Sequence, residues 1–311
     1  MRSEMSVLVT TYNNENFIEE CLNSVLSQNV NEPFQIILFD SASTDSTVEI
    51  ARNILGSRTS NFQIVVDREN RFWQGSAYML SAISSCQGEF IAFLDGDDFW
   101  IDNSKLEKQL RFLRSNPGVS VVGTSAEVWN QTQQVVERVI PEVGKLGTFP
   151  GRDLAAENYL VNSSVMARNH YENIQTNFYS MCLHKDYPLW AYLTQDSSFA
   201  VLPDITTRYR TSTGSNITQT YSDSFRKAID VQTRALLALN QNEDLSHLWL
   251  SSIFDDLYHH LTLDLNRPIY SKVLLQITNN DEINKDLTRK ILEISKLIQS
   301  IFENSPSYHS D

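Results

Sequence analysis

Apolar and polar positions alternate in blocks along the first hundred residues. Short apolar runs rich in β-branched residues predict strands over residues 6–11, 34–39, 62–66 and 89–94. Between them, apolar positions at helical spacing predict helices over 17–26 and 75–86, and Ser46 and Glu49 have capping-box spacing for another helix start. Strands and helices thus alternate four times. This pattern predicts an α/β fold with a mixed, mainly parallel sheet and helices on both faces.

Two of the predicted strands run directly into an aspartate. The strand over 34–39 is followed by Asp40, and the strand over 89–94 is followed by Asp95. In open α/β sheets, ligands gather at the carboxyl ends of parallel strands. We therefore expect both aspartates at a ligand-binding edge of the sheet.

The hydrophobic pattern changes near residue 222. Beyond it, recognisable strands disappear and helical spacing dominates, with the clearest stripe at Ile283, Leu287, Ile291, Ile294 and Ile298. We predict an α/β domain over 1–222 and a helical region over 223–311. Such a stripe must be buried, either against the core of the first domain or in homo-oligomer or membrane-surface contacts.

The composition is that of a soluble globular protein. Of 311 residues, 41% are hydrophobic and 20% are charged, and no stretch is long and uncharged enough to span a bilayer. The first ten residues, with Arg2 and Glu4, do not resemble a cleaved signal peptide. These features predict a cytoplasmic protein.

Cysteine spacing and net charge exclude further classes of function. The three cysteines, Cys21, Cys86 and Cys182, form no C-x-x-C pair, which favours small buried hydrophobes over disulfides or a zinc site. The formal net charge of −13 disfavours nucleic acid as a partner, because phosphate backbones attract a surplus of Lys and Arg.

Three carboxylates stand within four positions after the strand over 89–94. Asp95, Asp97 and Asp98 repel one another unless cations or protons offset their charge. Mg²⁺ or Mn²⁺ is suited to this role, because it binds through one or two carboxylates and the substrate's phosphates. A solvated acidic turn is the alternative for an isolated pattern of this kind, and the preceding strand favours the metal site.

Three sequence motifs, in a fixed order along the chain, resemble those of a known family. They are Val7-Leu-Val-Thr-Thr-Tyr-Asn13, Asp40-Ser-Ala-Ser-Thr-Asp45 and Gly88-Glu-Phe-Ile-Ala-Phe-Leu-Asp95-Gly-Asp-Asp98. In this order they resemble the family 2 glycosyltransferases of the GT-A fold, over Val7 to about Ile217. The resemblance implies a GT-A domain followed by a helical appendage.

The resemblance also implies a nucleotide-sugar site. It assigns the nucleotide to Thr11, Tyr12, Asn13 and Asp40, which suits their chemistry, since a carboxylate can accept a hydrogen bond from uracil N3 and a tyrosine ring can lie against the base. On their own, Tyr12 would equally be a loop aromatic packed on a helix and Asp40 a helix-start anion.

The same resemblance gives each acid of the aspartate cluster a role. It makes Asp97 the main ligand of Mn²⁺ or Mg²⁺, with Asp95 contacting ribose or metal-bound water and Asp98 supporting both.

A later segment resembles the part of the family that carries the catalytic base. Leu183-His-Lys-Asp186-Tyr-Pro-Leu-Trp190 is similar to a Glu-Asp-Tyr-x-Leu-Trp pattern whose second acid is the base, which implies this role for Asp186. Lys185 stands where Glu is usual. Without the resemblance, Asp186 would be interpreted as the N-terminal carboxylate of a helix, and Trp190 is expected in the core.

The last matching segment supplies arginines. Thr207-Arg-Tyr-Arg210 resembles a family segment from which Arg208 or Arg210 would pair with the pyrophosphate in a fork geometry. The chain departs from the family at Ser212, where a His is frequent, and at 78–80, where Tyr-Met-Leu replaces Ala-Arg-Asn. Donor contacts are therefore not transferred to 78–80.

The resemblance implies an inverting, metal-dependent transfer of sugar from a nucleotide-sugar, a UDP-sugar, to a hydroxyl of a carbohydrate or lipid-linked acceptor, in polysaccharide or glycoconjugate synthesis. Asp186 would deprotonate that hydroxyl while the metal stabilises the departing diphosphate. Lys185 and Ser212 leave open a catalytically silent nucleotide-sugar binder. A nucleotidyltransferase is a further alternative, although it usually needs a Gly-rich phosphate loop, and residues 10–17 contain no glycine.

Overall fold

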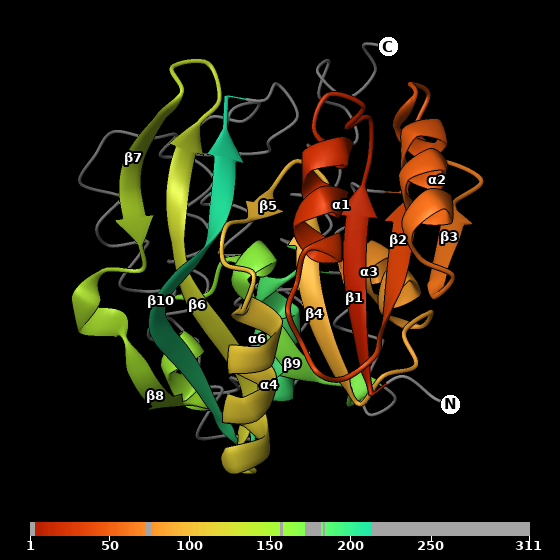
Figure 1. The fold of residues 1–311 in the computed structure, drawn as a ribbon. Helices are drawn as coiled ribbons and strands as arrows, with labels where there is room; N and C mark the ends of the chain where they lie inside the picture. The colour runs from red at the N-terminus through yellow and green to blue at the C-terminus, as the bar shows by residue number, and fades with distance from the viewer. Residues whose placement is uncertain (1–3, 72–75, 156–157, 172–181, 183, 213–311) are drawn as a thin grey trace, which may run out of the picture.

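A computed structural model of the chain describes residues 4–71, 76–155, 158–171, 182 and 184–212. Within these residues, ten strands form one mixed sheet in the order β3-β2-β1-β4-β9-β6-β10-β5, with β7 beside β6 and β8 beside β10 (Figure 1). The predicted α/β architecture, a mixed sheet flanked by helices, is confirmed.

The four strands predicted from the first hundred residues are present and mutually parallel. Their bounds are Met5–Thr11 for β1, Phe34–Asp40 for β2, Phe62–Val66 for β3 and Phe90–Asp95 for β4. In the register, Thr11 of β1 pairs with Asp40 on one side, and Thr10 pairs with Asp95 on the other. Both aspartates therefore lie at the same edge of the sheet, on either side of the end of β1.

The second half of the sheet is built around two long parallel strands, β6 and β10. The remaining bounds are Phe99–Trp100 for β5, Val119–Asn130 for β6, Val135–Ile140 for β7, Gly147–Pro150 for β8, Met166–Arg168 for β9 and Ser198–Thr211 for β10. Strand β9 runs antiparallel to both β4 and β6 and so joins the two halves. Strands β5 and β8 add antiparallel to β10.

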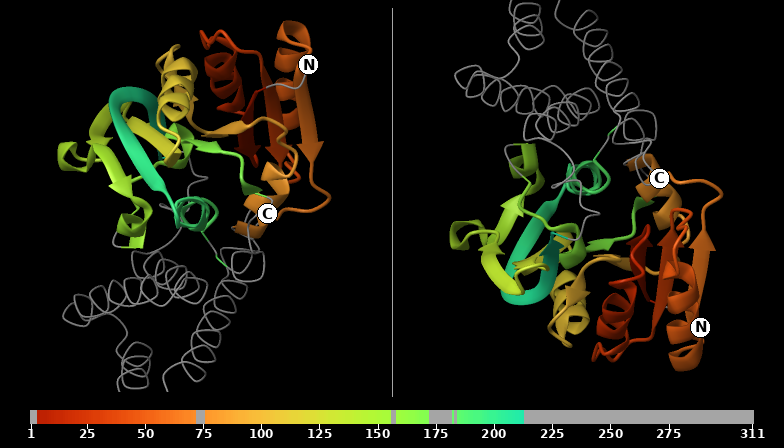
Figure 2. Two further views of the ribbon diagram at one scale, coloured as in Figure 1. Left: turned by 90° about the horizontal axis from the view of Figure 1, so that it is seen from below. Right: turned by 90° about the horizontal axis from the view of Figure 1, so that it is seen from above.

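Helices cover both faces of the sheet (Figure 2). The α-helices are α1 (Ile18–Leu26), α2 (Thr47–Arg58), α3 (Ser76–Ile83), α4 (Lys105–Ser115) and α6 (Tyr187–Leu193), and the 3-10 helices are η2 (Val143–Lys145), η3 (Gly151–Ala155) and η4 (Asn162–Ser164). Val7 and Val9 of β1 pack in the layer of α1, α2 and α4, whereas Leu8 packs in the layer of α3 and α6. Because both faces are buried, the strand is a continuous apolar run in the sequence.

The predicted capping box at the start of α2 is wrong. The side chain of Ser46 makes no capping hydrogen bond. Instead, Asp45 Oδ1 accepts from Thr47 N at 3.0 Å and from Thr47 Oγ1 at 2.5 Å. A carboxylate is a strong acceptor, and Asp45 binds the amide of the first helical residue in place of a hydroxyl cap from Ser46.

Several smaller predictions concern the core. Cys21, Cys86 and Cys182 are free and buried, as expected for small hydrophobes. Trp190 is fully buried and packs edge-on against Phe93, with ring centroids 4.9 Å apart, which confirms its place in the core.

The predicted boundary near residue 222 and the stripe from Ile283 to Ile298 lie outside the described residues. The same holds for the expected homo-oligomer and membrane-surface contacts of 223–311. Among the helices that the structure describes, none is long and apolar enough to cross a membrane.

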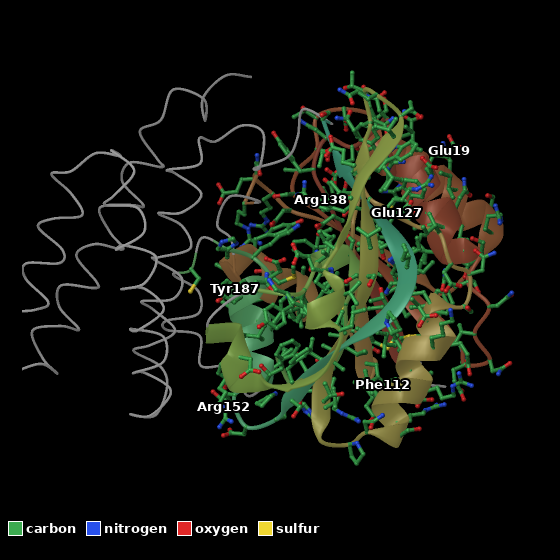
Figure 3. The ribbon with its side chains drawn as sticks, turned by 90° about the vertical axis from the view of Figure 1, so that its left-hand side faces the viewer. Glu19, Phe112, Glu127, Arg138, Arg152 and Tyr187 are labelled. Atoms are coloured by element: carbon green, nitrogen blue, oxygen red, sulfur yellow. The ribbon has the colours of Figure 1, made fainter. Side chains whose placement is uncertain are left out.

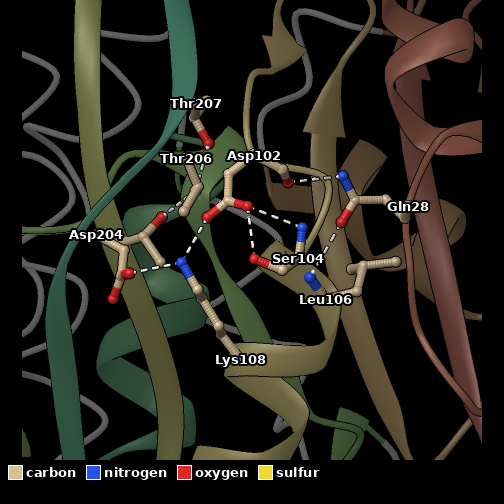
Figure 4. Close-up of polar contacts among 9 residues, drawn as sticks. Gln28, Asp102, Ser104, Leu106, Lys108, Asp204, Thr206 and Thr207 are labelled. Atoms are coloured by element: carbon tan, nitrogen blue, oxygen red, sulfur yellow. Dashed lines mark hydrogen bonds and ion pairs between the residues drawn. The ribbon is translucent and has the colours of Figure 1, made fainter.

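A polar network fastens the start of α4 to β10 and to the end of α1 (Figure 4). Lys108 Nζ donates to Asp102 Oδ2 at 2.7 Å and to Asp204 Oδ1 at 2.6 Å. Gln28 Nε2 donates to Asp102 O at 2.9 Å, and Gln28 Oε1 accepts from Leu106 N at 3.1 Å. The segment that follows the aspartate cluster is thereby fixed on both sides.

Lys105, beside this network, is a fully buried amine. Its Nζ donates to Gln109 Oε1 at 2.6 Å and lies 4.4 Å from the centroid of the Trp100 ring. Burial lowers the pKa of Lys105 to about 7, although the charge of Asp102 opposes the shift. Because an unfolded lysine has a pKa of about 10.4, the unfolded state binds more protons above pH 7, and stability from this group rises with pH there.

Replacing Lys105 with Met is expected to remove this pH dependence. The free energy of unfolding of the wild type, minus that of the variant, should rise by up to about 1.4 kcal/mol per pH unit between about pH 7 and 8.5. Denaturant titrations across this range measure the difference. A difference that stays constant with pH would contradict the assignment.

Candidate functional site

The carboxyl end of β1 is in direct contact with the end of β4 and the turn after it. Thr10 Oγ1 donates to Asp95 Oδ1 at 2.7 Å, and Gly96 N donates to Thr10 O at 2.8 Å. A Cβ atom at Gly96 would lie 2.6 Å from Thr11 Oγ1, so only glycine allows this approach. The predicted nucleotide residue Thr11 therefore lies beside the aspartate turn, as we call residues 95–98.

The loops after β1 and β2 are joined by hydrogen bonds around Asp40. Its Oδ2 accepts from Ser43 N at 2.8 Å, and its Oδ1 accepts from Ser43 Oγ at 2.5 Å. Ser43 Oγ in turn accepts from Asn13 N at 2.8 Å, and Asn13 Oδ1 accepts from Thr44 N at 2.9 Å. Burial raises the pKa of Asp40, while the hydrogen bonds from Ser43 oppose the shift. Half-buried Tyr12 lies in the same pair of loops.

Asp98 is the buried member of the aspartate turn. Its Oδ1 accepts from Arg210 N at 2.8 Å, and its Oδ2 accepts from Ser163 Oγ at 2.5 Å. Burial raises its pKa strongly, and the charges of Asp97 and Asp95 add to this. Asp98 thus ties the turn to β10 and η4, whereas Asp97 is only half-buried.

Lys185 and Asp186 meet the aspartate turn from a distant part of the chain. Lys185 Nζ forms an ion pair and hydrogen bond with Asp95 Oδ1. Burial lowers the pKa of Lys185, but the charges of Asp95, Asp186 and Asp97 outweigh it, and the net shift is upward. Lys185 therefore contacts Asp95 directly, and the charges of Asp97 and Asp186 act on the same ammonium.

The helix behind Asp186 is firmly packed. Asp186 is the N-cap of α6, and its Oδ1 accepts from Tyr187 N at 2.9 Å. Tyr187, labelled in Figure 3, donates from its hydroxyl to Leu154 O at 2.6 Å. Pro188 stands in the first turn of the helix. Asp186 therefore has the capping position expected of a helix-start acid. It caps a packed helix and directly follows Lys185 in the chain.

The two predicted arginines both lie on β10 and have protein partners. Arg208 Nε donates to Glu127 Oε2 at 2.7 Å, and its guanidinium lies 4.5 Å from the centroid of the Trp129 ring. Figure 3 labels Glu127 on the neighbouring strand β6.

Arg210 is almost completely buried. Its Nη1 donates to Asp97 O at 2.6 Å, its Nε donates to Gln131 Oε1 at 3.0 Å, and its Nη2 pairs with Glu20. The guanidinium also lies 4.3 Å from the centroid of the Phe99 ring. Arg210 therefore holds the backbone of the aspartate turn from the side of β10.

Residues of η4 belong to the site but carry no signal in the sequence. Besides its bond to Asp98, Ser163 Oγ accepts from Asp95 N at 3.1 Å. Asn162 beside it is buried, and neither polar atom of its amide has a hydrogen-bond partner. The loop that carries them matches none of the motifs found in the sequence, so only the fold identifies them.

Tyr78, the first residue of the departure at 78–80, lies in the core. Its hydroxyl donates to Phe39 O at 3.1 Å, and its ring packs edge-on against the Phe39 ring. Its large side chain therefore fills space between α3 and β2.

The aspartate turn fits a divalent cation only together with a substrate. Over the described residues, no group of three or more His, Cys, Asp and Glu side chains could hold a metal by itself. Mg²⁺ and Mn²⁺ need only one or two carboxylates when phosphate oxygens and waters complete their coordination. The half-buried Asp97 suits this role, since Asp98 uses both carboxylate oxygens within the protein.

A protein-family model described as glycosyl transferase family 2 matches residues 6–192. Curated relatives include a glycosyltransferase of Haemophilus influenzae without further characterisation, 29% identical over 63% of this chain and 78% of its own length. The Escherichia coli UDP-Glc:α-D-GlcNAc-diphosphoundecaprenol β-1,3-glucosyltransferase WfaP is 24% identical over 72% of this chain and 84% of its own length. An uncharacterised Mycobacterium tuberculosis protein is 29% identical, and the match spans only 58% of its length.

Solved structures share the fold. A structure of S. aureus TarS in complex with UDP-GlcNAc matches with a TM-score of 0.64 at 16% identity, covering 96% of this chain and 91% of that chain. The mannosyltransferase PcManGT from Pyrobaculum calidifontis, in complex with GDP-Man and Mn²⁺, matches with a TM-score of 0.56 at 14% identity, covering 98% and 89%. The expected GT-A fold is confirmed.

Proposed function

The chain belongs to glycosyl transferase family 2, and we propose that it is an inverting enzyme that moves a sugar from a nucleoside-diphosphate sugar to an acceptor hydroxyl. One observation carries the proposal: the nucleotide loops, the aspartate turn and the segment of Lys185 and Asp186 meet at one edge of the sheet. A displacement between two substrates requires this proximity of donor groups and base.

The proposed donor is a UDP-sugar. Thr11, Tyr12, Asn13 and Asp40 would hold its base and ribose, with Asp40 accepting from uracil N3–H and the Tyr12 ring lying against the base. The joined loops after β1 and β2 support this placement. WfaP is named for UDP-Glc and the TarS structure contains UDP-GlcNAc, which favours a uridine donor.

The diphosphate would lie at the aspartate turn. Asp97 would hold Mn²⁺ or Mg²⁺ together with the phosphate oxygens, Asp95 would contact ribose or metal-bound water, and Asp98 would support both. When bound, the ion neutralises charge that develops on the departing diphosphate. Arg208 would release Glu127 and pair with the pyrophosphate instead. Arg210 would act indirectly, by holding the backbone of the aspartate turn.

Asp186 would be the catalytic base. It takes the proton of the acceptor hydroxyl, whose oxygen forms a bond to the anomeric carbon while the bond from that carbon to the diphosphate oxygen breaks. The nucleoside diphosphate leaves with the bonding electrons. A single displacement inverts the anomeric configuration.

The acceptor would be a carbohydrate or a lipid-linked saccharide. The name of the WfaP relative, with its diphosphoundecaprenol acceptor, supports the second of these. Polysaccharide or glycoconjugate synthesis at the cytoplasmic face of a membrane is the matching setting, with 223–311 supplying homo-oligomer or membrane-surface contacts.

A donor panel tests the proposal. The full chain is incubated with UDP-sugars and GDP-sugars in Mn²⁺, and thermal stability and release of nucleoside diphosphate are measured. A donor at 100 times its Kd should stabilise the fold by about 2.7 kcal/mol, and hydrolysis, with water in place of the acceptor hydroxyl, should release the diphosphate. Stabilisation without any release would instead indicate a silent nucleotide-sugar binder, and release of pyrophosphate from a nucleoside triphosphate and a sugar phosphate would indicate a nucleotidyltransferase.

Replacing Asp40 with Ala is expected to weaken UDP binding about tenfold to a hundredfold. The reason is the loss of a hydrogen bond to a charged acceptor, which contributes on the order of 1.5–3 kcal/mol. Isothermal titration calorimetry with UDP measures the change.

The control for Asp40 is Ser43→Ala. This variant removes the hydroxyl between Asp40 and Asn13 but keeps the carboxylate. It should retain UDP affinity within about threefold if Asp40 binds the base directly. Equal losses in both variants would show that Asp40 acts only by holding the loops together.

A further inference from the structure

Lys185 places a fixed cation among the carboxylates of the proposed site. Its side chain and that of Asp95 are only 17% and 16% exposed, and the two form an ion pair. Asp97 and Asp186 also raise the pKa of Lys185, so both carboxylates lie within electrostatic reach of the ammonium. Three carboxylates thus act on one largely covered ammonium.

The hydrogen bonding of Asp95 does not by itself require this lysine. Asp95 Oδ1 already accepts from Thr10 Oγ1 at 2.7 Å, and Asp95 N donates to Ser163 Oγ at 3.1 Å. Burying a lysine costs free energy unless the charge is compensated. Asp95 compensates the charge of Lys185, and the ion pair holds the ammonium at the aspartate turn, where the diphosphate is proposed to bind.

Lysine also suits the chemistry of that ligand. Its ammonium has three donors and no acceptor, and it binds phosphate as a compact point charge. The backbone beside it is fixed, because Asp186 caps α6 and Trp190 anchors that helix against Phe93. Lys185 therefore lies in a bend that leads directly into a packed helix.

We propose that Lys185 is a phosphate-binding residue of the donor site, whose ammonium contacts the donor's diphosphate beside the metal position. This inference rests on the proposed function. Lys185 then supplies part of the positive charge that the diphosphate needs, and a nucleoside diphosphate binds measurably without a divalent cation. A glutamate at this position would make the site two charges more negative. The metal alone would then have to neutralise the charge of the diphosphate.

The experiment is UDP binding by the full chain, measured calorimetrically in Mn²⁺ and in EDTA. The wild type should bind UDP in EDTA, and Lys185→Met should weaken this metal-free binding by about tenfold to a hundredfold. Lys185→Arg keeps the charge and should restore most of it, whereas Lys185→Glu should bind UDP only in Mn²⁺. Circular dichroism confirms that each variant is folded.

Lys108→Met is the matched control, because Lys108 bridges two carboxylates in the network at the start of α4. It should leave UDP binding unchanged in both conditions. Wild-type binding that requires Mn²⁺, or equal metal-free binding by wild type and Lys185→Met, overturns the inference while leaving the proposed function intact. Failure of the wild type to bind UDP or GDP in either condition overturns both.

Discussion

Replacing Asp186 with Asn is expected to lower kcat by about 10²–10⁴ while donor affinity changes little. Asparagine keeps the size of the side chain and an oxygen that can still accept from Tyr187 N, so the cap of α6 survives. It cannot take a proton from the acceptor hydroxyl. Steady-state kinetics with the donor identified by the panel, together with UDP calorimetry, separates the loss of chemistry from a loss of binding.

Asp196→Asn is the matched control for this prediction. Asp196 is an exposed acid just beyond the other end of α6, so its replacement should leave kcat unchanged. Near-wild-type turnover by Asp186→Asn, under conditions where chemistry limits the rate, would place the base elsewhere. Loss of UDP affinity equal to the loss of kcat would make Asp186 a donor-binding residue.

Replacing Asp97 with Ala is expected to reduce transfer by about 10²–10⁴ and to abolish the effect of Mn²⁺ on UDP affinity. The variant loses the carboxylate proposed to hold the ion against the diphosphate, and such an ion contributes several kcal/mol of charge stabilisation to the transition state. Titration of UDP at increasing Mn²⁺ concentration measures this effect without requiring turnover.

Asp153→Ala is the control here, because Asp153 lies in η3 and not in the aspartate turn. It should retain both transfer and the response to Mn²⁺. If a chelator leaves wild-type transfer intact, or if Asp97→Ala still responds to Mn²⁺ as the wild type does, Asp97 is not the main metal ligand.

The first half of the fold was predictable mainly because β1, β2 and β4 are apolar and largely buried on both faces. Such strands form continuous apolar runs, and the predicted ends at Asp40 and Asp95 match those of β2 and β4. The second half offered weaker signals, because buried polar residues such as Thr124 and Thr206 interrupt the apolar runs of the long strands β6 and β10. Strand β9 has three residues and β5 has two, so neither is long enough to show an alternation of apolar and polar residues. Strand β7 exposes the consecutive residues Val135 and Val136, so its sequence does not alternate between a buried and an exposed face.

The candidate site divides in the same way. Residues in contiguous motifs, such as Thr11 and Asp97, were found from the sequence. The ion pair between Lys185 and Asp95 joins positions 90 apart, and Ser163 lies in a segment without a motif. Contacts between residues so far apart in the sequence leave no local pattern, so the three-dimensional structure was needed to reveal them.

The hydrogen bond from Arg210 N to Asp98 has a consequence for the protein during its synthesis. It spans 112 positions and comes from β10, the last strand that the structure describes. A ribosome releases the chain from its N-terminus, so the loops after β1 and β2 can form early, while the aspartate turn lacks this bond until β10 has emerged. The proposed donor site therefore gains its contact with β10 only after synthesis has passed Thr211, the last residue of that strand.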